Sequence, residues 1–285
     1  MDIKNSWLCT RPVVHRGLHN SELPENSLGA FEHAIKEGYP IEIDLRVTDD
    51  GEIVVFHDDK LTRMTNQDGY VCNYDAATLK GTHLLKSDGK RSDYTIPTFE
   101  EVLTTVNGQV PLLIEVKNSS KAGAFESKII SMLHAYNGEY AVQSFNPYSL
   151  EYFKENAEEI LRGQLSCFFC KSELSGFFRR NLLKKLKLNK VSKPDFVAYR
   201  FSDLPNKFVT KCNLPVLAWV VKSNADYESV KPHCDRRPRQ AAAQHRVQRA
   251  CHCCRLRPWR NRLFEGVSHQ KVRSPRARGS DLYRL

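Results

Sequence analysis

The chain lacks the features that mark membrane-spanning, secreted and nucleotide-binding proteins. It has no run of ~18 apolar residues, the length that a transmembrane helix needs. Its first residues, MDIKNSWLCTRP, show neither the basic start nor the apolar stretch of a signal peptide, so we expect a cytoplasmic protein with reduced thiols. No GxGxxG or P-loop string is present, which weakens the case for a doubly wound nucleotide-binding sheet.

The nine cysteines lack the spacing of a structural zinc site. Cys167 and Cys170 form a C-x-x-C pair, but no second pair accompanies them. The cluster over 251–254 is too crowded for one tetrahedral ion, since adjacent residues rarely bind the same metal. We interpret the cysteines before residue 235 as small buried apolar residues.

Acidic residues and lysines are scarce at the end of the chain. The whole chain has 43 basic and 33 acidic residues. Residues 236–285 hold 13 Arg and one Lys against two acids, a net charge of +12, whereas residues 1–235 have a net charge of −2. This change divides the chain into a main domain, 1–235, and an Arg-rich tail, 236–285.

Three interpretations of the tail are open. We favour aberrant or disordered sequence that replaces the natural end of the domain. The alternatives are a basic arm that binds nucleic acid or anionic lipid, and a replacement strand over Arg262–Val267.

Short β-rich runs alternate with helical patterns over 1–235, as in βαβ units with a mostly parallel sheet. About seven strand–helix units fit a TIM (β/α)₈ barrel whose eighth unit is missing or abnormal. Residues 58–97 show little periodicity and are expected to form a small, mostly looped insertion after the second strand. The expected strands are Val13–His15, Ile41–Val47, Ile53–His57, Leu112–Val116, Tyr140–Phe145, Gly163–Phe169, Asp195–Arg200 and Val216–Val221. The expected helices are Ser27–Glu37, Thr98–Val106, Lys121–Tyr136, Pro147–Asn156, Gly176–Leu188 and Ala225–Val230.

The ends of the predicted strands are unusually polar, and catalytic groups of a parallel barrel lie at such ends. Glu42 and Asp44 share one face of a strand whose other face is apolar, so both acids should point into the barrel interior. Buried acids require a cation, and a divalent metal is the natural partner. Other strand ends supply His15, His57 and Glu115.

Six strings together resemble the glycerophosphodiester phosphodiesterase family of the bacterial cytoplasmic type. They are HRG at 15–17, PENS at 24–27, EIDLRVTDDGEIVVFHD at 42–58, LTRMTNQDG at 61–69, IPTFEEVL at 96–103 and IEVK at 114–117. The resemblance implies a TIM-barrel, metal-dependent hydrolase that splits glycerophosphodiesters into glycerol 3-phosphate and an alcohol.

The resemblance also implies a role for individual residues. The implied ligands of Mg²⁺ or Ca²⁺ are Glu42, Asp44 and Glu115. The implied acid–base pair is His15 and His57. The implied substrate-binding residues are Arg16, Lys117, Gln143 and Trp219, and Asn26 is placed to orient a metal ligand.

The sequence leaves several functional alternatives open. The attacking group is either water or the neighbouring glycerol hydroxyl, the latter through a cyclic phosphate. A related activity on lysophospholipid or phosphoinositide head groups is the second choice, and a non-catalytic nucleic-acid-binding protein is a third. We expect a small-molecule substrate and no nucleic-acid partner. The basic segment Gly176–Leu188 is expected to be an outer barrel helix rather than a membrane-surface helix.

Overall fold

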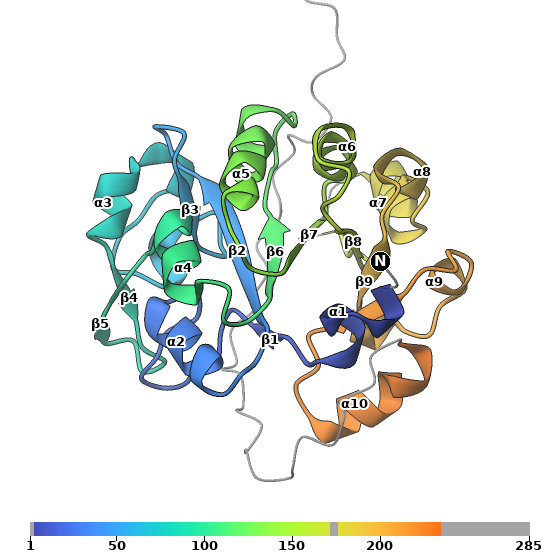
Figure 1. The fold of residues 1–285 in the computed structure, drawn as a ribbon, viewed down its shortest axis with the longest axis horizontal. Helices are drawn as coiled ribbons and strands as arrows, with labels where there is room; N and C mark the ends of the chain where they lie inside the picture. The colour runs from blue at the N-terminus through green and yellow to red at the C-terminus, as the bar shows by residue number, and fades with distance from the viewer. Residues whose placement is uncertain (1–2, 172–175, 235–285) are drawn as a thin grey trace, which may run out of the picture.

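The structure is a computed structural model that describes residues 3–171 and 176–234 (Figure 1). The strands are β1 (Val14–His15), β2 (Ile41–Val47), β3 (Ile53–Val55), β4 (His83–Leu85), β5 (Arg91–Thr95), β6 (Leu112–Val116), β7 (Tyr140–Ser144), β8 (Arg162–Ser166), β9 (Phe196–Arg200) and β10 (Val216–Trp219). The helices are α1 (Trp7–Thr10), α2 (Leu28–Lys36), α3 (Ala76–Lys80), α4 (Phe99–Val106), α5 (Ala124–His134), α6 (Pro147–Asn156), α7 (Phe177–Lys184), α8 (Asn189–Ser192), α9 (Lys207–Thr210) and α10 (Asn224–Val230). The predicted Arg-rich tail, 236–285, lies outside the described residues.

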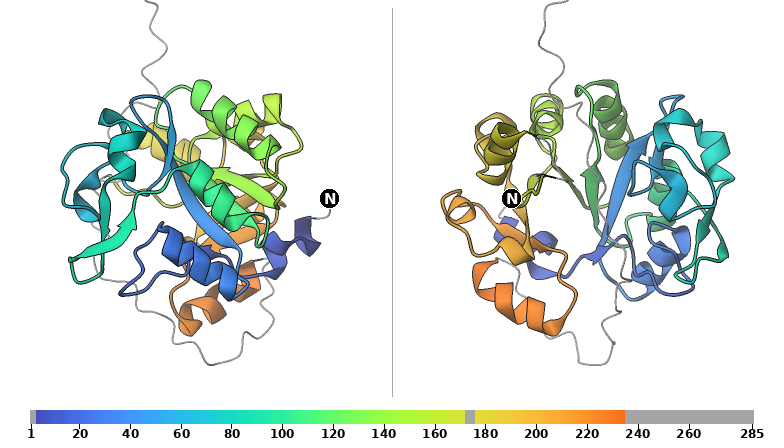
Figure 2. Two further views of the ribbon diagram at one scale, coloured as in Figure 1. Left: turned by 60° about the vertical axis from the view of Figure 1, so that its left-hand side comes forward. Right: turned by 180° about the vertical axis from the view of Figure 1, so that it is seen from behind.

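The main sheet follows the order of the chain, β1-β2-β6-β7-β8-β9-β10, and all neighbours in this path are parallel. The short strand β3 is antiparallel to β2. A doubly wound sheet reverses its strand order at a switch point, and this sheet does not. The predicted α/β barrel is therefore confirmed, and helices α2, α4, α5 and α6 lie on the outer side of a curled sheet (Figure 2). Within the two described ranges, no eighth parallel strand joins β10 to β1, as expected for an abnormal eighth unit.

The alternation of residues along β2 separates apolar from acidic side chains. Ile41, Ile43 and Leu45 pack in the outer core with residues of α2 and α4. Neighbouring residues of a strand point to opposite faces, so Glu42 and Asp44 point into the barrel. Both acids are buried, at 4% and 0% exposure. The apolar pattern of one strand thus positions the acids of the candidate site.

A cluster of apolar side chains fills the part of the barrel interior that lies away from these acids. Five consecutive strands of the path contribute to it. The residues are Leu113, Ala141, Leu165, Phe196, Ala198 and Leu217, of which Phe196 and Ala198 both come from β9. Helix α1, which the sequence pattern did not predict, adds Trp7 and Leu8 to the same cluster. Burial of each large side chain contributes about 1.5–3 kcal/mol. The interior is therefore a packed core rather than an open channel.

The insertion over 58–97 is more ordered than the expected loop. It contains α3 and the antiparallel hairpin β4–β5, which lie together at one side of the molecule (Figure 1). Its residues form a small core of their own with Val54 and Phe56, to which they contribute Leu61, Val71, Leu79, Leu84 and Ile96. Each element is only three to five residues long, which is too short for a clear period. The Asp88-Gly89 pair between the strands was a usable hairpin signal.

The helix expected over Gly176–Leu188 is interrupted. Helix α7 ends at Lys184, and Leu186 adopts a left-handed backbone with φ of 54°. This conformation accompanies the burial of the Leu186 side chain against Val197 and Tyr199 of β9. Tertiary contact therefore overrides the helical pattern.

No helix in the described ranges is both long and apolar enough to cross a bilayer. The cytoplasmic location expected from the sequence stays a prediction.

Gly17 and Gly51 provide a matched test of packing at the end of β1. Both have a positive φ, 81° and 78°. A Cβ on Gly17 would lie 2.9 Å from Ala30 and Phe31, whereas a Cβ on Gly51 would meet nothing within 4 Å. We expect Gly51→Ala to cost about 1–2 kcal/mol from backbone strain alone. Gly17→Ala should cost about 1–3 kcal/mol more because it also overpacks the core. Urea unfolding of both variants checks this, and equal losses would contradict the contact.

Candidate active site

Three buried carboxylates meet inside the barrel. Glu42 and Asp44 come from β2, and Glu115 comes from β6, where it pairs in register with Asp44. One oxygen of each carboxylate lies within 4.8 Å of the others, and the residues are 4%, 0% and 8% exposed. The residues that the sequence predicted as metal ligands therefore converge on one point.

Burial and mutual repulsion disturb the ionisation of this cluster. Burial, followed by the charges of Asp44 and Glu115, raises the pKa of Glu42 well above its usual range. Burial likewise raises the pKa of Glu115, although the Lys117 ammonium opposes it. The pKa of Asp44 is lowered despite burial, because Lys117 and other cationic groups favour its charged form. The cations present therefore do not stabilise the ionised form of all three carboxylates.

The residues present fit a divalent cation. The site contains five carboxylates and three cations, which together carry a formal charge of −2 if all are ionised. The acids are Glu25, Glu42, Asp44, Asp58 and Glu115. The cations are Arg16, Arg63 and Lys117. Asp44 Oδ1 is buried without a hydrogen-bond partner, although Lys117 Nζ lies 3.1 Å away as an ion pair. Asn26 donates to the other oxygen, Asp44 Oδ2, at 2.8 Å and so orients this ligand. An all-oxygen set of this kind suits Mg²⁺ or Ca²⁺ rather than zinc.

Two predicted substrate-binding cations lie against the carboxylates. Lys117 Nζ is 2.6 Å from Glu115 Oε1, and Arg16 Nε is 3.3 Å from Asp44 Oδ2. The turn after β1 sets the position of Arg16, whose φ is 60° and whose backbone N–H donates to Glu42 Oε2 at 3.1 Å. Both side chains are buried and can therefore interact strongly with an anion.

The two predicted catalytic histidines flank the cluster. His15 ends β1 opposite Glu42, and His57 follows β3. Burial and the charge of Arg16 lower the pKa of His15 well below its usual value. Burial, followed by Lys117 and Arg16, lowers the pKa of His57 to about 4. Both imidazoles are therefore neutral at neutral pH.

A chain of ion pairs behind His57 was not predicted. Asp58 Oδ1 lies 2.6 Å from His57 Nδ1. Arg63 joins Asp58 to Glu25, and Glu25 also accepts from Arg16 at 2.7 Å. Arg63 lies in the string LTRMTNQDG, but only the fold of the insertion shows that it returns to the site. This network fixes the orientation of His57 and Arg16.

Gln143 and Trp219 occupy different parts of the barrel. Gln143 of β7 is buried and pairs in register with Glu115, so it adjoins the carboxylates. Trp219 ends β10 and packs edge-on against Phe145, with ring centroids 5.7 Å apart. Its indole Nε1 is buried without a hydrogen-bond partner in the described ranges. Trp219 thus reaches the end of β7 through Phe145 but lies outside the charged cluster.

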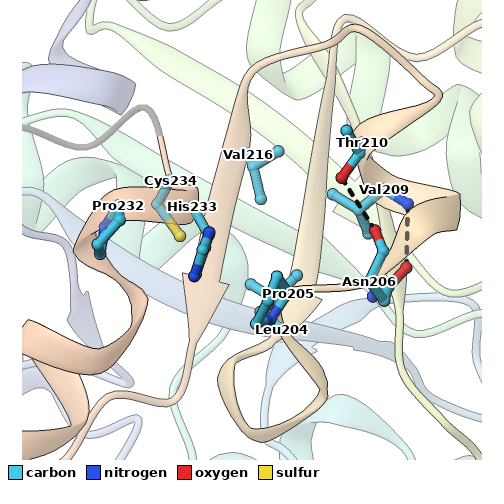
Figure 3. A pocket seen from close by; sticks show the side chains of 9 residues that line it. All are labelled: Leu204, Pro205, Asn206, Val209, Thr210, Val216, Pro232, His233 and Cys234. Carbon is cyan, nitrogen blue, oxygen red and sulfur yellow. Dashed lines mark hydrogen bonds between the residues drawn. The ribbon is translucent and has the colours of Figure 1, made fainter.

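A cavity of about 330 Å³ lies elsewhere, between α9, β10 and the last described residues (Figure 3). Among the described residues, its lining includes Leu204, Val209 and Val216, with His233 as the one imidazole and no carboxylate. The described lining lacks the Lys and Arg side chains that would bind a phosphodiester. The carboxylate cluster remains the candidate site.

Residues 15–247 match the profile of the Glycerophosphoryl diester phosphodiesterase family. The chain belongs to this family. The match runs past the composition change near residue 235, and the boundary between barrel and tail stays a prediction.

Curated relatives agree with this assignment, and a solved structure shares the fold. The chain is 33% identical over 163 residues to a glycerophosphodiester phosphodiesterase of Caldanaerobacter subterraneus subsp. tengcongensis, covering 55% of this chain and 66% of the relative. It is 36% identical over 156 residues to one of Bacillus altitudinis, covering 50% and 61%. The chain thus spans just under two thirds of the length of these curated relatives. An Oleispira antarctica phosphodiesterase, solved with the product sn-glycerol-3-phosphate, shares the fold at a TM-score of 0.64 with 22% identity, covering 79% of this chain and 92% of that one.

Glu25 allows a pH test of the ion-pair network. Burial opposes its ionisation, but Arg16 and Arg63 outweigh burial and lower its pKa from 4.5 to about 2. Because the pKa is lower in the folded state, the resulting stability, about 3 kcal/mol, is present above pH 4.5 and is lost as the pH falls toward 2. Glu25→Gln should therefore destabilise the protein near neutral pH, and the difference from wild type should shrink below pH 4.5.

Urea unfolding at several pH values measures this difference. Glu22→Gln is the matched control, because Glu22 makes an exposed pair with Lys86 and its loss should leave the free energy of unfolding nearly unchanged. Equal effects of the two substitutions would show that the buried network does not stabilise the fold.

Proposed function

We propose that the protein hydrolyses glycerophosphodiesters to glycerol 3-phosphate and an alcohol at the carboxylate cluster. The observation that carries the proposal is the convergence of Glu42, Asp44 and Glu115, with two buried cations and two neutral imidazoles around them. Membership in the family supports this substrate class, as does the product named for the Oleispira antarctica enzyme.

Glu42, Asp44 and Glu115 would hold one divalent cation, Mg²⁺ or Ca²⁺. When bound, such an ion would supply positive charge that stabilises the negative charge gained by the phosphoryl oxygens in the transition state. Asn26 keeps Asp44 oriented toward that position through its hydrogen bond.

Arg16 and Lys117 would bind the phosphodiester anion. Their side chains are 8% and 9% exposed, so water screens their charges only weakly. Both are held by carboxylates in the absence of substrate, which places them before the anion arrives. Gln143 lies beside Glu115 and would contact the bound phosphodiester. Trp219 would line the outer part of the substrate pocket.

His57 would take the proton from the attacking hydroxyl. The negative charge of the bound phosphodiester would favour the protonated imidazole of His15, which would then give its proton to the leaving oxygen. Asp58 keeps a lowered pKa, because the contact with His57 and the pairing with Arg63 outweigh burial. An ionised Asp58 accepts a hydrogen bond from His57 Nδ1–H, which leaves the lone pair of Nε2 free to act as a base. The attacking hydroxyl belongs either to water or to the glycerol moiety itself.

Release of glycerol 3-phosphate from glycerophosphocholine and glycerophosphoethanolamine tests the activity directly. We expect release that EDTA abolishes and that added Mg²⁺ or Ca²⁺ restores, because three buried acids repel one another without a cation. Full activity in EDTA would exclude the metal from the reaction. Release from lysophospholipids alone would redirect the proposal to a related diesterase, and no release from any diester would favour a non-catalytic protein.

His15→Ala and His57→Ala should each lower kcat by about 10²–10⁴-fold, the usual contribution of a positioned acid or base. Metal binding, measured by calorimetry, should stay close to that of wild type because the three carboxylates remain. His134→Ala is the matched control, since His134 pairs with Glu159 on the outer surface. Wild-type turnover in both site variants would overturn the acid–base assignment.

A further inference from the structure

Helix α7 is anchored to the barrel at its C-terminal end. Leu183 is buried, and its carbonyl accepts from Ser166 Oγ at 2.9 Å. The carbonyl of Lys184 accepts from Tyr199 Oη at 2.9 Å. These contacts join the end of α7 to β8 and β9. The fold therefore fixes the direction in which the other end of the helix points.

The N-terminal end of α7 exposes two adjacent phenylalanines. Phe177 and Phe178 are 76% and 74% exposed, whereas the other exposed large hydrophobic side chains in the described ranges are only 37–40% exposed. An outer barrel helix buries its apolar residues against the sheet, as Leu183 does. The barrel does not bury this aromatic pair. The packing expected of an outer barrel helix therefore describes only the C-terminal half of α7, where Leu183 is buried.

The segment that contains α7 and α8, residues 176–194, is positively charged. Residues 176–194 contain seven Lys and Arg residues and no acidic residue. Lys184 Nζ lies 5.2 Å from the ring centroid of Phe168, a further exposed aromatic, and Lys187 and Lys190 are exposed. Exposed phenylalanines among cations match the boundary of an anionic lipid layer, where aromatic rings reach the acyl chains and cations meet the head groups.

An aromatic chain links this segment to the pocket side of the barrel. Phe168 is followed by Phe169, whose ring lies 5.9 Å from that of Phe145. Phe145 in turn packs against Trp219, which is expected to line the substrate pocket. Helices α7 and α8 lie on the side of the molecule opposite the β4–β5 hairpin in Figure 1 and in the right-hand view of Figure 2. The charged insertion therefore does not obstruct access to this surface.

We propose that Phe177, Phe178 and the surrounding lysines form a docking surface for anionic membranes. The two rings would enter the head-group region while Lys187 and Lys190 contact anionic lipids. Docking would hold the protein at a lipid surface without a spanning helix. The proposal goes beyond the diesterase activity and does not depend on it.

Sedimentation of the full chain with lipid vesicles tests the proposal. Wild type should bind phosphatidylcholine vesicles that contain phosphatidylglycerol, and binding should weaken with added salt. Phe177→Ser with Phe178→Ser should lower the partition coefficient about tenfold or more, because two apolar side chains lose their lipid contact. Lys187→Glu with Lys190→Glu should lower binding to anionic vesicles only. Tyr70→Ser, at a 39% exposed ring on the insertion, is the matched control and should bind as wild type does.

Three outcomes would overturn the docking surface. The first is no binding of wild type to anionic vesicles. The second is unchanged binding of the double phenylalanine variant, which would assign vesicle binding to another segment such as 236–285. The third is a selective loss of RNA binding in that variant, which would identify a nucleic-acid surface instead. Turnover of soluble glycerophosphocholine should be unchanged in the variant, so a failure of docking is distinguishable from a failure of the diesterase assignment.

Discussion

The structure depends on bringing three carboxylates into a place that water scarcely reaches. Such a cluster is costly unless positive charge surrounds it, and Arg16 and Lys117 supply only part of that charge. The remaining deficit, together with the raised pKa of Glu42, leaves room for a divalent ion. The same shortage of positive charge that makes the cluster unstable as a structural element favours the bound divalent cation proposed above.

Ordinary barrel geometry produces this arrangement. Two parallel strands in register place Asp44 beside Glu115, and the period of two along β2 places Glu42 on the same inner face. Isoleucine and leucine on the outer face hold the strand in that register, since a shift by one residue would turn the acids toward the helices. Packing on the outer face of β2 therefore determines which acidic side chains face the barrel interior.

The sequence predicted the parts of the site that depend on local pattern. The alternation over Ile41–Val47 placed the acids inside, and the polar strand ends identified His15, His57 and Glu115. The role of Arg63 could not be predicted, because it arises when the insertion folds back to contact Glu25. The break at Leu186 was missed for a similar reason, since contact with β9 decides it. The metal, the acid–base roles and the barrel–tail boundary stay predictions.

His15 ends, and Arg16 directly follows, the strand that has the least support in the described structure. Strand β1 is two residues long and pairs with β2 alone, so one of its edges has no strand beside it among residues 3–171 and 176–234. Short edge segments open locally more readily than central strands. Whatever covers that seam would influence how steadily the imidazole of His15 is held. A substitution that loosens the pairing of β1 with β2 would thus slow the proposed reaction while every charged group of the site remains in place.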